Sequence, residues 1–461
     1  MLDKKLLTDV LQAALKHGGD FAEIYLEERL LNNVLCEENR IEKINSGREQ
    51  GAGIRVIKDE YTAYVFTNNL NENNLKQAAI LAGKAAQRSS RPVTDFNLLQ
   101  KQADFQMHFQ YWPEHLELDK KVDQVLAANQ AARDTDKEIR QVTAAIGDVH
   151  KKIQIANSLG DYIEDEWARI RLLVQAIAAR DGRIQTGYEV AGGVTGYEFL
   201  NQVSFTQMAE QAASRAVNML SARPAPVGRM PVVMHAEAGG TMVHEACGHG
   251  LEADLVQKGL SVYQNKLGQK VAADGVSVID DATLLSRNGS YHFDDEGCPA
   301  QRTVLIENGI LKAYMNDRMT AMKQGSSPTG NGRRESYQYR PVPRMSNTYI
   351  APGQDDPEDI IRDTPRGLLV KRMGGGQVNT TNGDFVFDVQ EGYLIENGKI
   401  SSPVRGATLT GNGPQVLMDI DRIGNDLGFG LGMCGKDGQS VPVGDAQPTI
   451  RIKSLTVGGL V

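Results

Sequence analysis

The stretch "TMVHEACGHGLEAD" at residues 241–254 places two histidines five residues apart, with a glutamate directly after the first. The whole chain of 461 residues has only eight histidines. Imidazole nitrogens are good zinc ligands, and two of them on one helix can chelate one ion. His244 and His249 are therefore candidate metal ligands. Glu245 is a candidate general base, able to take a proton from a metal-bound water and pass it to a leaving amine.

The spacing of these histidines differs from that of the usual zinc-peptidase motif. In His-Glu-x-x-His the two ligands lie at i and i+4, about 40° apart around the helix. Here they lie at i and i+5, about 140° apart on an ideal helix, and would not converge on one ion. A one-residue π-bulge, or a helix that ends or bends just before His249, would bring them together. Gly248 and Gly250 make either distortion easy, although two hydrogen-bonded histidines without a metal remain the plain alternative.

The elements around the motif form a rigid mount for such a site. The preceding run "PVVMHAEA" is typical of a buried strand, and Gly239-Gly240 indicates a turn. Thr241 is a plausible N-cap for a helix over "MVHEACGHGLEADLV". We therefore expect strand, turn and helix in succession.

A zinc peptidase site needs a third protein ligand and an open fourth position. Cys247 lies in the same turn as the histidines and would be strained as a ligand, while Cys298 and Cys434 lie in loop-like sequence. A small buried hydrophobic group is the ordinary role of a cysteine. Glycines surround Cys434, so the backbone can approach another segment closely there. The same glycines spell G-x-G-x-x-G, but no apolar strand precedes them and no helix can follow, which argues against a dinucleotide site.

Composition narrows the class of protein. Lysine and arginine number 50 against 58 aspartates and glutamates, a net charge of −8, which gives no sign of nucleic-acid binding. The amphipathic N-terminus lacks the apolar core of a signal peptide, and no stretch of about 18 apolar residues predicts a membrane span. Four cysteines in a chain of this length do not make a disulfide framework. We expect a cytoplasmic protein that binds neither nucleic acid nor membrane.

Periodicity predicts an α+β fold. Residues 1–226 form an N-terminal α/β region of two similar helix–strands–helix units, at about 1–95 and 115–226. Residues 91–114 are expected to be an irregular linker. Residues 227–461 form a β-rich domain with few helices, the clearest of which carries the His-Glu motif. In that domain "LIENG" occurs at 305–309 and at 394–398, and Asn-Gly between β-prone runs predicts two tight hairpins.

Four segments together resemble the TldD branch of the TldD/PmbA (TldE) zinc metallopeptidases: "HEACGHGLEADLV", "FDDEGCPAQRTVLIENG", "TGNGRRESYQYRPVPRMSNTYI" and "GMCGKDGQSVPVG". The resemblance implies one Zn²⁺ per catalytic subunit, bound by His244, His249 and Cys434, with Glu245 as the catalytic glutamate. It also implies short or unfolded peptides as substrates, an enclosed cavity, and a TldE/PmbA-like partner in a heterodimer, with a homodimer as the alternative. Cys247, inside the motif, is not required by that pattern.

Substrate-binding residues are expected in two segments. In 330–350, Arg333, Arg334 and Tyr337 would form a wall that clamps a peptide carboxylate or carbonyl, with a structural loop as the alternative. In 374–389, the Gly-rich start with Gly375 and Gln377 leads into a β-prone run. An exposed strand there could pair with an extended peptide. The acidic run at 292–299 is expected to be an ordinary turn, with a role behind the metal ligands or as a calcium-like loop as alternatives.

The leading hypothesis is a zinc-dependent peptidase. A zinc-stabilised peptide-binding or scaffold protein is an alternative, but a purely structural site has no use for a carboxylate beside its ligand and tends to have four protein ligands. A zinc hydrolase of non-peptide amides is a further alternative.

Overall fold

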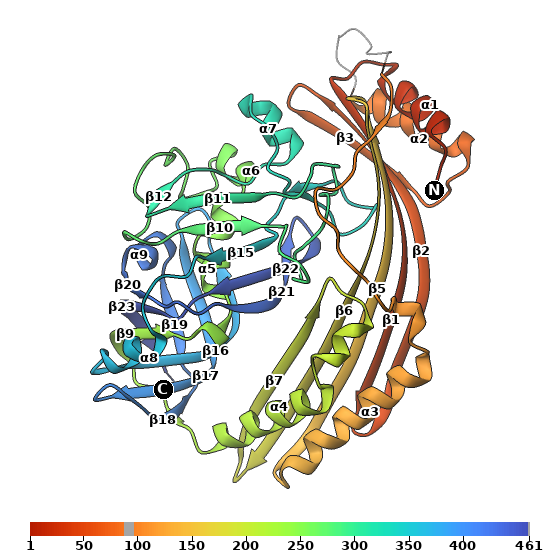
Figure 1. The fold of residues 1–461 in the computed structure, drawn as a ribbon. Helices are drawn as coiled ribbons and strands as arrows, with labels where there is room; N and C mark the ends of the chain where they lie inside the picture. Colours follow the sequence, from red (N-terminus) through yellow and green to blue (C-terminus); the bar gives the residue numbers. More distant parts are fainter. Residues whose placement is uncertain (87–95, 460–461) are drawn as a thin grey trace.

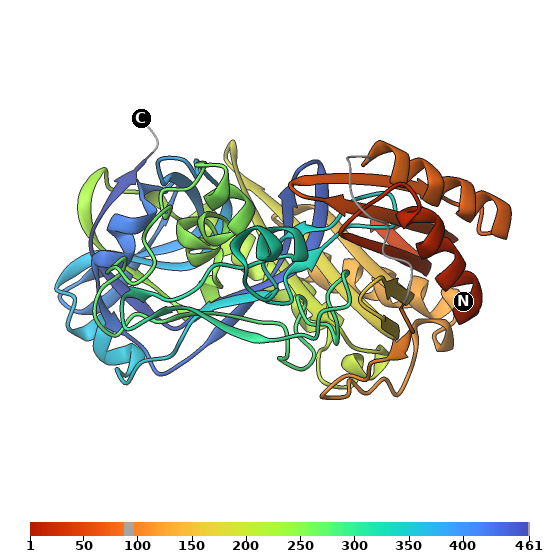
Figure 2. The same cartoon turned by 90° about the horizontal axis from the view of Figure 1, so that it is seen from above.

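The chain folds into an N-terminal sheet flanked by helices and a β-rich C-terminal part that packs beside it (Figures 1 and 2). The computed structural model describes residues 1–86 and 96–459. Residues 87–95, where the predicted first unit meets the predicted linker, lie outside the described residues, and so do residues 460–461. The predicted α+β class is confirmed. No helix in the described part of the chain is long and apolar enough to span a bilayer.

Two helix–strands–helix units build the N-terminal region. The first consists of α1 (Lys4–Leu15), β1 (Phe21–Glu37), β2 (Arg40–Lys58), β3 (Tyr61–Thr67) and α2 (Glu72–Ala85). The second consists of α3 (Leu118–Thr135), β5 (Ile139–Asn157), β6 (Asp161–Arg180), β7 (Arg183–Gly193) and α4 (Phe205–Leu220). Between them, residues 96–112 are irregular except for β4 (Leu99–Gln100), which pairs with β6.

The strands of both units join one seven-stranded sheet, because β1 pairs with β5 along almost its whole length. The strand order is β3-β2-β1-β5-β6-β4, and β7 also pairs with β6. Helices α1 and α2 cover one end of the sheet with a core of leucines, valines and alanines. Helices α3 and α4 cover the other end in the same way (Figure 1). The opposite, concave face turns toward the C-terminal part.

The first hairpin carries no clear sequence signal of a turn. Within the run "NVLCEENRIEKI" the chain reverses at Glu38-Asn39, between β1 and β2. Both residues have positive φ (51° and 58°). A glycine usually marks such a turn in the sequence, because glycine has no side chain to oppose positive φ. Glu38-Asn39 lacks that signal.

The C-terminal part contains two large sheets. The eight-stranded sheet consists of β8 (Arg223–Pro224), β9 (Gly228–Met234), β16 (Arg366–Val378), β17 (Asp384–Glu396), β18 (Lys399–Arg405), β19 (Thr408–Asn412), β20 (Ile420–Ile423) and β23 (Ile450–Gly458). The six-stranded sheet consists of β10 (Val278–Asp281), β11 (Arg302–Glu307), β12 (Ile310–Leu311), β15 (Asn347–Ile350), β21 (Gly428–Lys436) and β22 (Gln439–Gln447). Short elements complete it: β13 (Gly332–Arg333), β14 (Val342–Pro343), α7 (Arg318–Gln324), α8 (Pro357–Arg362) and α9 (Gly413–Met418).

The two predicted Asn-Gly hairpins are confirmed. Asn308-Gly309 joins β11 to β12, and Asn397-Gly398 joins β17 to β18. All four residues have positive φ. One apolar core fills the space between the two sheets, and the metal-motif helix lies inside it.

Buried ion pairs fasten the N-terminal sheet to the C-terminal part. Arg55 on β2 bonds both to Glu23 on β1 (2.8 Å) and to Glu296 (2.5 Å). Arg334 reaches across the same boundary and bonds to the other oxygen of Glu23 at 2.6 Å. All four side chains are almost completely buried. Because an unpaired buried charge is strongly unfavourable, these contacts specify how the two parts dock.

Candidate metal centre

The helix that carries the His-Glu motif is distorted at the motif itself. It begins as α5 (Thr241–Val243), continues as a π-helical turn over His244–Gly248, and tightens into a 3₁₀ turn over His249–Leu251 before α6 (Ala253–Gln257). The backbone N–H of His249 donates to the carbonyl of His244, five residues back. Of the two distortions that the spacing allowed, the π-bulge is the one present at the motif, and it brings i and i+5 to one side of the helix.

The glycines of this helix serve close packing. Gly248 has an ordinary helical φ of −51°, but a Cβ there would overlap the side chain of Met345. A Cβ on Gly240 would overlap the backbone of Ala446. The N-cap is Gly240, so the prediction of Thr241 as N-cap is wrong by one residue. Close contact with β22 takes the place of a side-chain cap.

The side chains of His244, His249 and Cys434 converge. One ligand atom from each lies within 4.8 Å of the other two. The Sγ of Cys434 is 3.4 Å from Nε2 of His249, and the two imidazole rings are perpendicular with centroids 4.9 Å apart. Cys434 comes from β21, and Arg344 donates a hydrogen bond to its carbonyl. These three form the cluster of metal-ligating groups found in the part of the chain that the structure describes.

The donor set fits a zinc ion. Two zinc ligands, one sulfur and one nitrogen, in tetrahedral geometry lie about 3.6 Å apart, close to the separation of Cys434 and His249. The Nδ1 of His244 is buried and has no hydrogen-bond partner among the described residues. A buried polar atom without a partner is unfavourable unless something bonds to it. Two imidazoles and a thiolate, with no fourth protein ligand in the cluster, match an open catalytic site.

The pKa values of Cys434 and His249 also favour a bound cation. Burial alone would raise the pKa of Cys434, but hydrogen bonds from His244 and His249 lower it to about 4. Burial opposes the charged form of His249, yet Glu252 and Cys434 hold the pKa of that imidazole well above its ordinary value. The site thus favours a thiolate with positive charge beside it. A bound cation supplies that charge, and protons on the imidazoles replace it otherwise.

Glu245 lies next to this cluster without bonding to it. The side chain is partly exposed, whereas His244 is buried. Partial burial raises the pKa of Glu245 above its ordinary value, against the lowering effect of the two histidines. A carboxylate with a raised pKa that reaches solvent is suited to accept and return protons.

A chain of buried charges stands behind His249, and sequence reasoning missed it. Nδ1 of His249 is 3.1 Å from Glu252, whose carboxylate also bonds to Lys436 (3.0 Å). Lys436 bonds in turn to Asp254 at 2.6 Å. Such partners fix the orientation of a ligating imidazole. The spacing held a signal: Glu252 follows His249 by three residues, and Lys436 lies two residues after Cys434 on the same strand face.

The other candidate cysteines lie outside the cluster. Cys247 is fully buried in the apolar core, and its thiol donates to the carbonyl of Val243. Burial raises its pKa to about 12. Cys298 bonds to Gln301 and to the carbonyl of Pro328. Both thiols are packing groups.

The predicted substrate wall lies at the boundary between the two parts of the molecule. Arg334 bonds to Glu23, to Tyr64 and to the carbonyl of Asp295. The ring of Tyr337 packs directly on Gly51 of β2, and its carbonyl accepts from Tyr64. Arg334 and Tyr337 therefore join the two parts of the molecule, and their contact with substrate stays a prediction. Arg333 faces a cavity at the same boundary and bonds only to carbonyls.

The acidic run at 292–299 also lies at this boundary. It forms a turn, because Asp294 accepts from the N–H groups of Glu296 and Cys298. Burial and the charge of Glu296 raise the pKa of Asp294 well above its ordinary value. The predicted turn is confirmed, and its neighbours are Arg55 and Arg334.

Gly375 and Gln377 lie on an exposed stretch of β16. The stretch pairs with β17 on one side. On its other side β9 pairs only with Leu368–Val370, and no strand of the described residues continues beyond. No atom lies within 4 Å of where a Cβ of Gly375 would be. β16 as a whole also contacts the π-helical turn that carries His244 and Glu245.

Comparison with known proteins agrees with this geometry. Three models of the PmbA/TldA metallopeptidase match in order: domain 1 at residues 22–86, the central domain at 111–220 and the C-terminal domain at 227–459. A metalloprotease TldD homolog of Haemophilus influenzae is 35% identical over 468 residues, covering 99% of this chain and 97% of that protein. A zinc metalloprotease TldD homolog of Saccharolobus solfataricus is 29% identical, covering 96% and 98%. The crystal structure of TldE from Thermococcus kodakarensis superposes with a TM-score of 0.79 at 20% identity, covering 98% of this chain and 100% of that one.

The class that emerges is a metallopeptidase. The chain belongs to the PmbA/TldD metallopeptidase family, and the match extends over nearly its whole length.

Proposed function

We propose that this protein is a zinc-dependent peptidase that hydrolyses short or unfolded peptides, with one zinc ion held by His244, His249 and Cys434. The observation that carries the proposal is the convergence of these three donors within 4.8 Å, beside a partly exposed Glu245. The zinc named in the S. solfataricus relative supports the choice of metal.

Zinc bound there would polarise a carbonyl and acidify a coordinated water. Glu245 is the general base in this proposal: one carboxylate oxygen accepts the proton of the attacking water and returns it to the leaving nitrogen. Glu252 keeps the ring of His249 oriented through Nδ1, so that Nε2 points toward Cys434. Lys436 in turn holds Glu252.

The substrate would bind in extended form along the free edge of β16, at Gly375 and Gln377. Main-chain pairing reads the peptide backbone more than its side chains and is therefore tolerant of sequence. Gly375 has only a hydrogen atom in place of a side chain, which leaves space for a second strand.

Selectivity would come from access in a dimer. The likeness to TldE supports a TldE/PmbA-like partner, with a homodimer as the alternative. Two such β-rich parts facing each other would enclose the site and admit only an extended chain. A peptidase of this kind would work in the cytoplasm without attacking folded proteins.

The direct test replaces Glu245 by glutamine. Because an amide cannot accept the proton, Glu245→Gln should bind zinc in the same amount and lose at least about a hundredfold in peptide turnover. Zinc content and turnover of a quenched fluorescent peptide measure the two effects, alone and with the partner subunit. The matched control is Glu237→Gln, an exposed glutamate in the turn before the helix, which should retain full activity. Parental turnover in Glu245→Gln would remove Glu245 as the base.

A further inference from the structure

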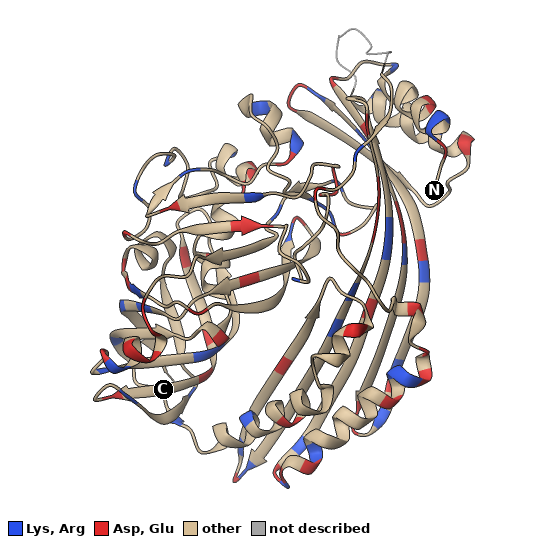
Figure 3. Cartoon of the chain, in the orientation of Figure 1, with Lys and Arg blue, Asp and Glu red and all other residues tan. Residues whose placement is uncertain are grey.

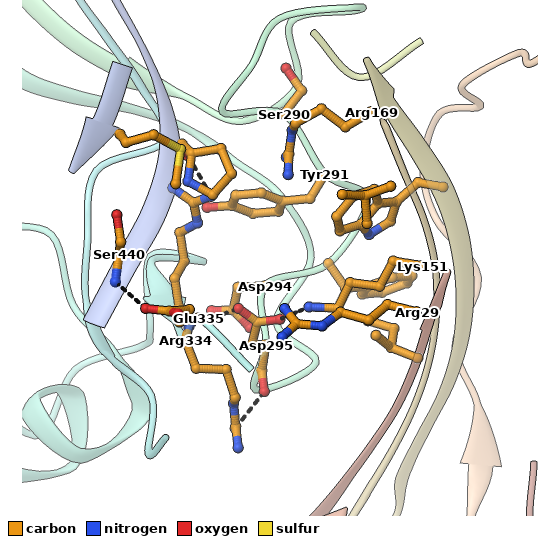
Figure 4. A pocket seen from close by; sticks show the side chains of 17 residues that line it. Arg29, Lys151, Arg169, Ser290, Tyr291, Asp294, Asp295, Arg334, Glu335 and Ser440 are labelled. Atoms are coloured by element: carbon orange, nitrogen blue, oxygen red, sulfur yellow. Dashed lines mark hydrogen bonds and ion pairs between the residues drawn. The ribbon is translucent and has the colours of Figure 1, made fainter. Parts of the chain in front are cut away.

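A cavity of about 260 Å³ lies between the concave face of the N-terminal sheet and the C-terminal part (Figure 4). β5 and β6 form one wall. The segments around 290–295 and 333–335, together with the β21–β22 hairpin, form the other. In Figure 4, Arg169 and Lys151 reach in from the sheet side, opposite Asp294 and Glu335. The proposed function leaves this cavity unused.

Two guanidinium groups in the cavity bond to backbone carbonyls and form no ion pair among the described residues. Arg169 donates to the carbonyl of Asn288 at 3.1 Å, and Arg333 donates to the carbonyls of Met345 (2.5 Å) and Pro442 (2.7 Å). Within residues 1–86 and 96–459, neither forms an ion pair with a carboxylate. Arg333 is 95% buried. The Nε of Arg169 is buried and has no hydrogen-bond partner among those residues.

The other charged groups of the cavity have partners of their own. Lys151 bonds to Glu27 at 2.9 Å, and Arg29 bonds to Glu49 at 2.6 Å. Three carboxylates of the lining accept from backbone N–H groups: Asp294 from Gly332 (2.9 Å), Asp295 from Arg334 (2.8 Å) and Glu335 from Ser440 (2.6 Å). Arg169 and Arg333 are the two guanidinium groups of the lining that donate to backbone carbonyls without an ion pair among the described residues.

The two guanidinium groups also repel each other. Burial, and then the charge of Arg333, lowers the pKa of Arg169 to about 9. Each group stacks on an aromatic ring: Arg169 lies 4.6 Å from the centre of Trp167, and Arg333 lies 5.2 Å from that of Tyr291. Stacking covers the faces of a guanidinium, so a planar anion would approach the N–H groups of its edge that the backbone carbonyls leave unused.

Much of the remaining lining is apolar, with Ser290 and Ser440 as polar exceptions. Val149, Ile153 and Phe293 face the cavity, as do Met433 and Pro442. An inorganic ion would leave these groups without a partner. A molecule with an apolar body and one carboxylate would satisfy both the apolar wall and the two arginines.

We propose that this cavity binds an organic carboxylate, held by Arg169 and Arg333. The carboxylate could be the free C-terminus of a peptide or a small free acid, and both present the same chemistry to the arginines. Cys434 and Met433 are neighbours on β21, and successive side chains of a strand point to opposite faces. Met433 lines the cavity, whereas Cys434 faces the metal-ligand cluster, so the carboxylate site lies on the other side of the strand.

Calorimetric titration of the full chain tests the proposal without any need for turnover. N-acetyl-leucine should bind saturably at one site, and N-acetyl-leucinamide, which lacks the charge, at least about tenfold more weakly. Arg169→Gln should weaken binding of the acid by at least about tenfold, with an unchanged melting temperature. Arg171→Gln is the matched control, two residues further along the same face of β6 and outside this lining, and should bind as the parent does.

An acetylated pentapeptide ending in leucine, with its amidated twin, distinguishes the two sources of carboxylate. In the Glu245→Gln background, tighter binding of the acid pentapeptide than of N-acetyl-leucine indicates a peptide C-terminus, and equal or weaker binding indicates a free small acid. Equal affinity for acid and amide, absence of saturable binding, or equal losses in Arg169→Gln and Arg171→Gln would each overturn the proposal. Loss of peptidase activity in Glu245→Gln has no bearing on these results, so the two proposals can fail separately.

Discussion

At the scale of residues, the cluster depends on how each ligand is held. His249 has a partner at both ring nitrogens, Glu252 at one and Cys434 at the other. Nδ1 of His244 is buried and has no hydrogen-bond partner among the described residues. The thiolate of Cys434 is stabilised by both imidazoles, so the three side chains form one electrostatic unit.

Cys434→Ser is expected to weaken zinc binding strongly, because a hydroxyl is a far poorer ligand for zinc than a thiolate. The loss of zinc affinity should exceed about 10–100-fold, which is the range typical when a hydrogen-bond partner of a metal ligand is removed. Competition with a coloured chelator measures the affinity. Cys298→Ser is the control, since that buried thiol lies outside the cluster, and it should keep the parental affinity. Stoichiometric, tight zinc in Cys434→Ser would exclude Cys434 as a ligand.

At the scale of elements, the site combines a distorted helix, a strand that brings the thiol, and a free strand edge. The π-helical turn rotates His249 toward His244. β21 presents Cys434 to both. The exposed stretch of β16 leaves main-chain groups available for pairing on the side that β9 does not cover.

The free edge of β16 can be tested by filling the space at Gly375. Gly375→Val should fold normally, because no atom lies within 4 Å of the position of its Cβ, and valine favours strands. It should raise KM for peptides several-fold with little change in kcat, since bulk there would obstruct the incoming strand. Gly47→Val, on β2 of the N-terminal sheet and equally open, is the control. Unchanged KM in Gly375→Val would argue against strand pairing at this edge.

Sequence alone could predict local geometry well, because local signals determine it. The i, i+5 spacing predicted the π-turn, and Asn308-Gly309 predicted a hairpin. The turn at Glu38-Asn39 was missed for want of a glycine. Arg334, a predicted substrate contact, bonds to Glu23, a residue 311 positions away. No local pattern reveals a partner at that distance, and Cys434 was assigned as a ligand only through family resemblance.

At the scale of the whole molecule, the ion pairs between the two parts should dominate the response to mutation. Arg334→Leu leaves the buried Glu23 with only Arg55 as partner, and should lower the free energy of unfolding by about 3–5 kcal/mol. Arg340→Leu removes a half-exposed arginine of the same segment, paired with Asp437 at 3.4 Å, and should cost less than about 1 kcal/mol. Urea unfolding followed by circular dichroism compares the two. Similar losses of unfolding free energy in the two variants would mean that the buried ion pairs do not stabilise the docking of the N-terminal sheet on the C-terminal part.

Sequestration in a dimer predicts that folded proteins resist cleavage. A folded substrate must first lose its own stability, roughly 5–15 kcal/mol, before it can enter as an extended chain. We expect a stable dimer that buries at least about 2,000 Å², as obligate interfaces do. Light scattering measures the mass, and digestion of one protein in its folded and permanently unfolded forms measures selectivity. A fully active monomer, or equal cleavage of both forms, would contradict the sequestration and leave the metal chemistry untouched.

The long separation between the ligands has a consequence for biosynthesis. Cys434 follows His249 by 185 residues, so one ion would close a loop through most of the C-terminal part. The ribosome delivers both histidines and Glu245 long before it delivers β21. A nascent chain that has not reached β21 carries the base but no thiolate, and β22, which pairs with β21 and β15, is also still missing. If the proposed ligand set is right, the order of translation would keep an unfinished chain from becoming a protease, because zinc would lack its thiolate ligand until β21 has been made.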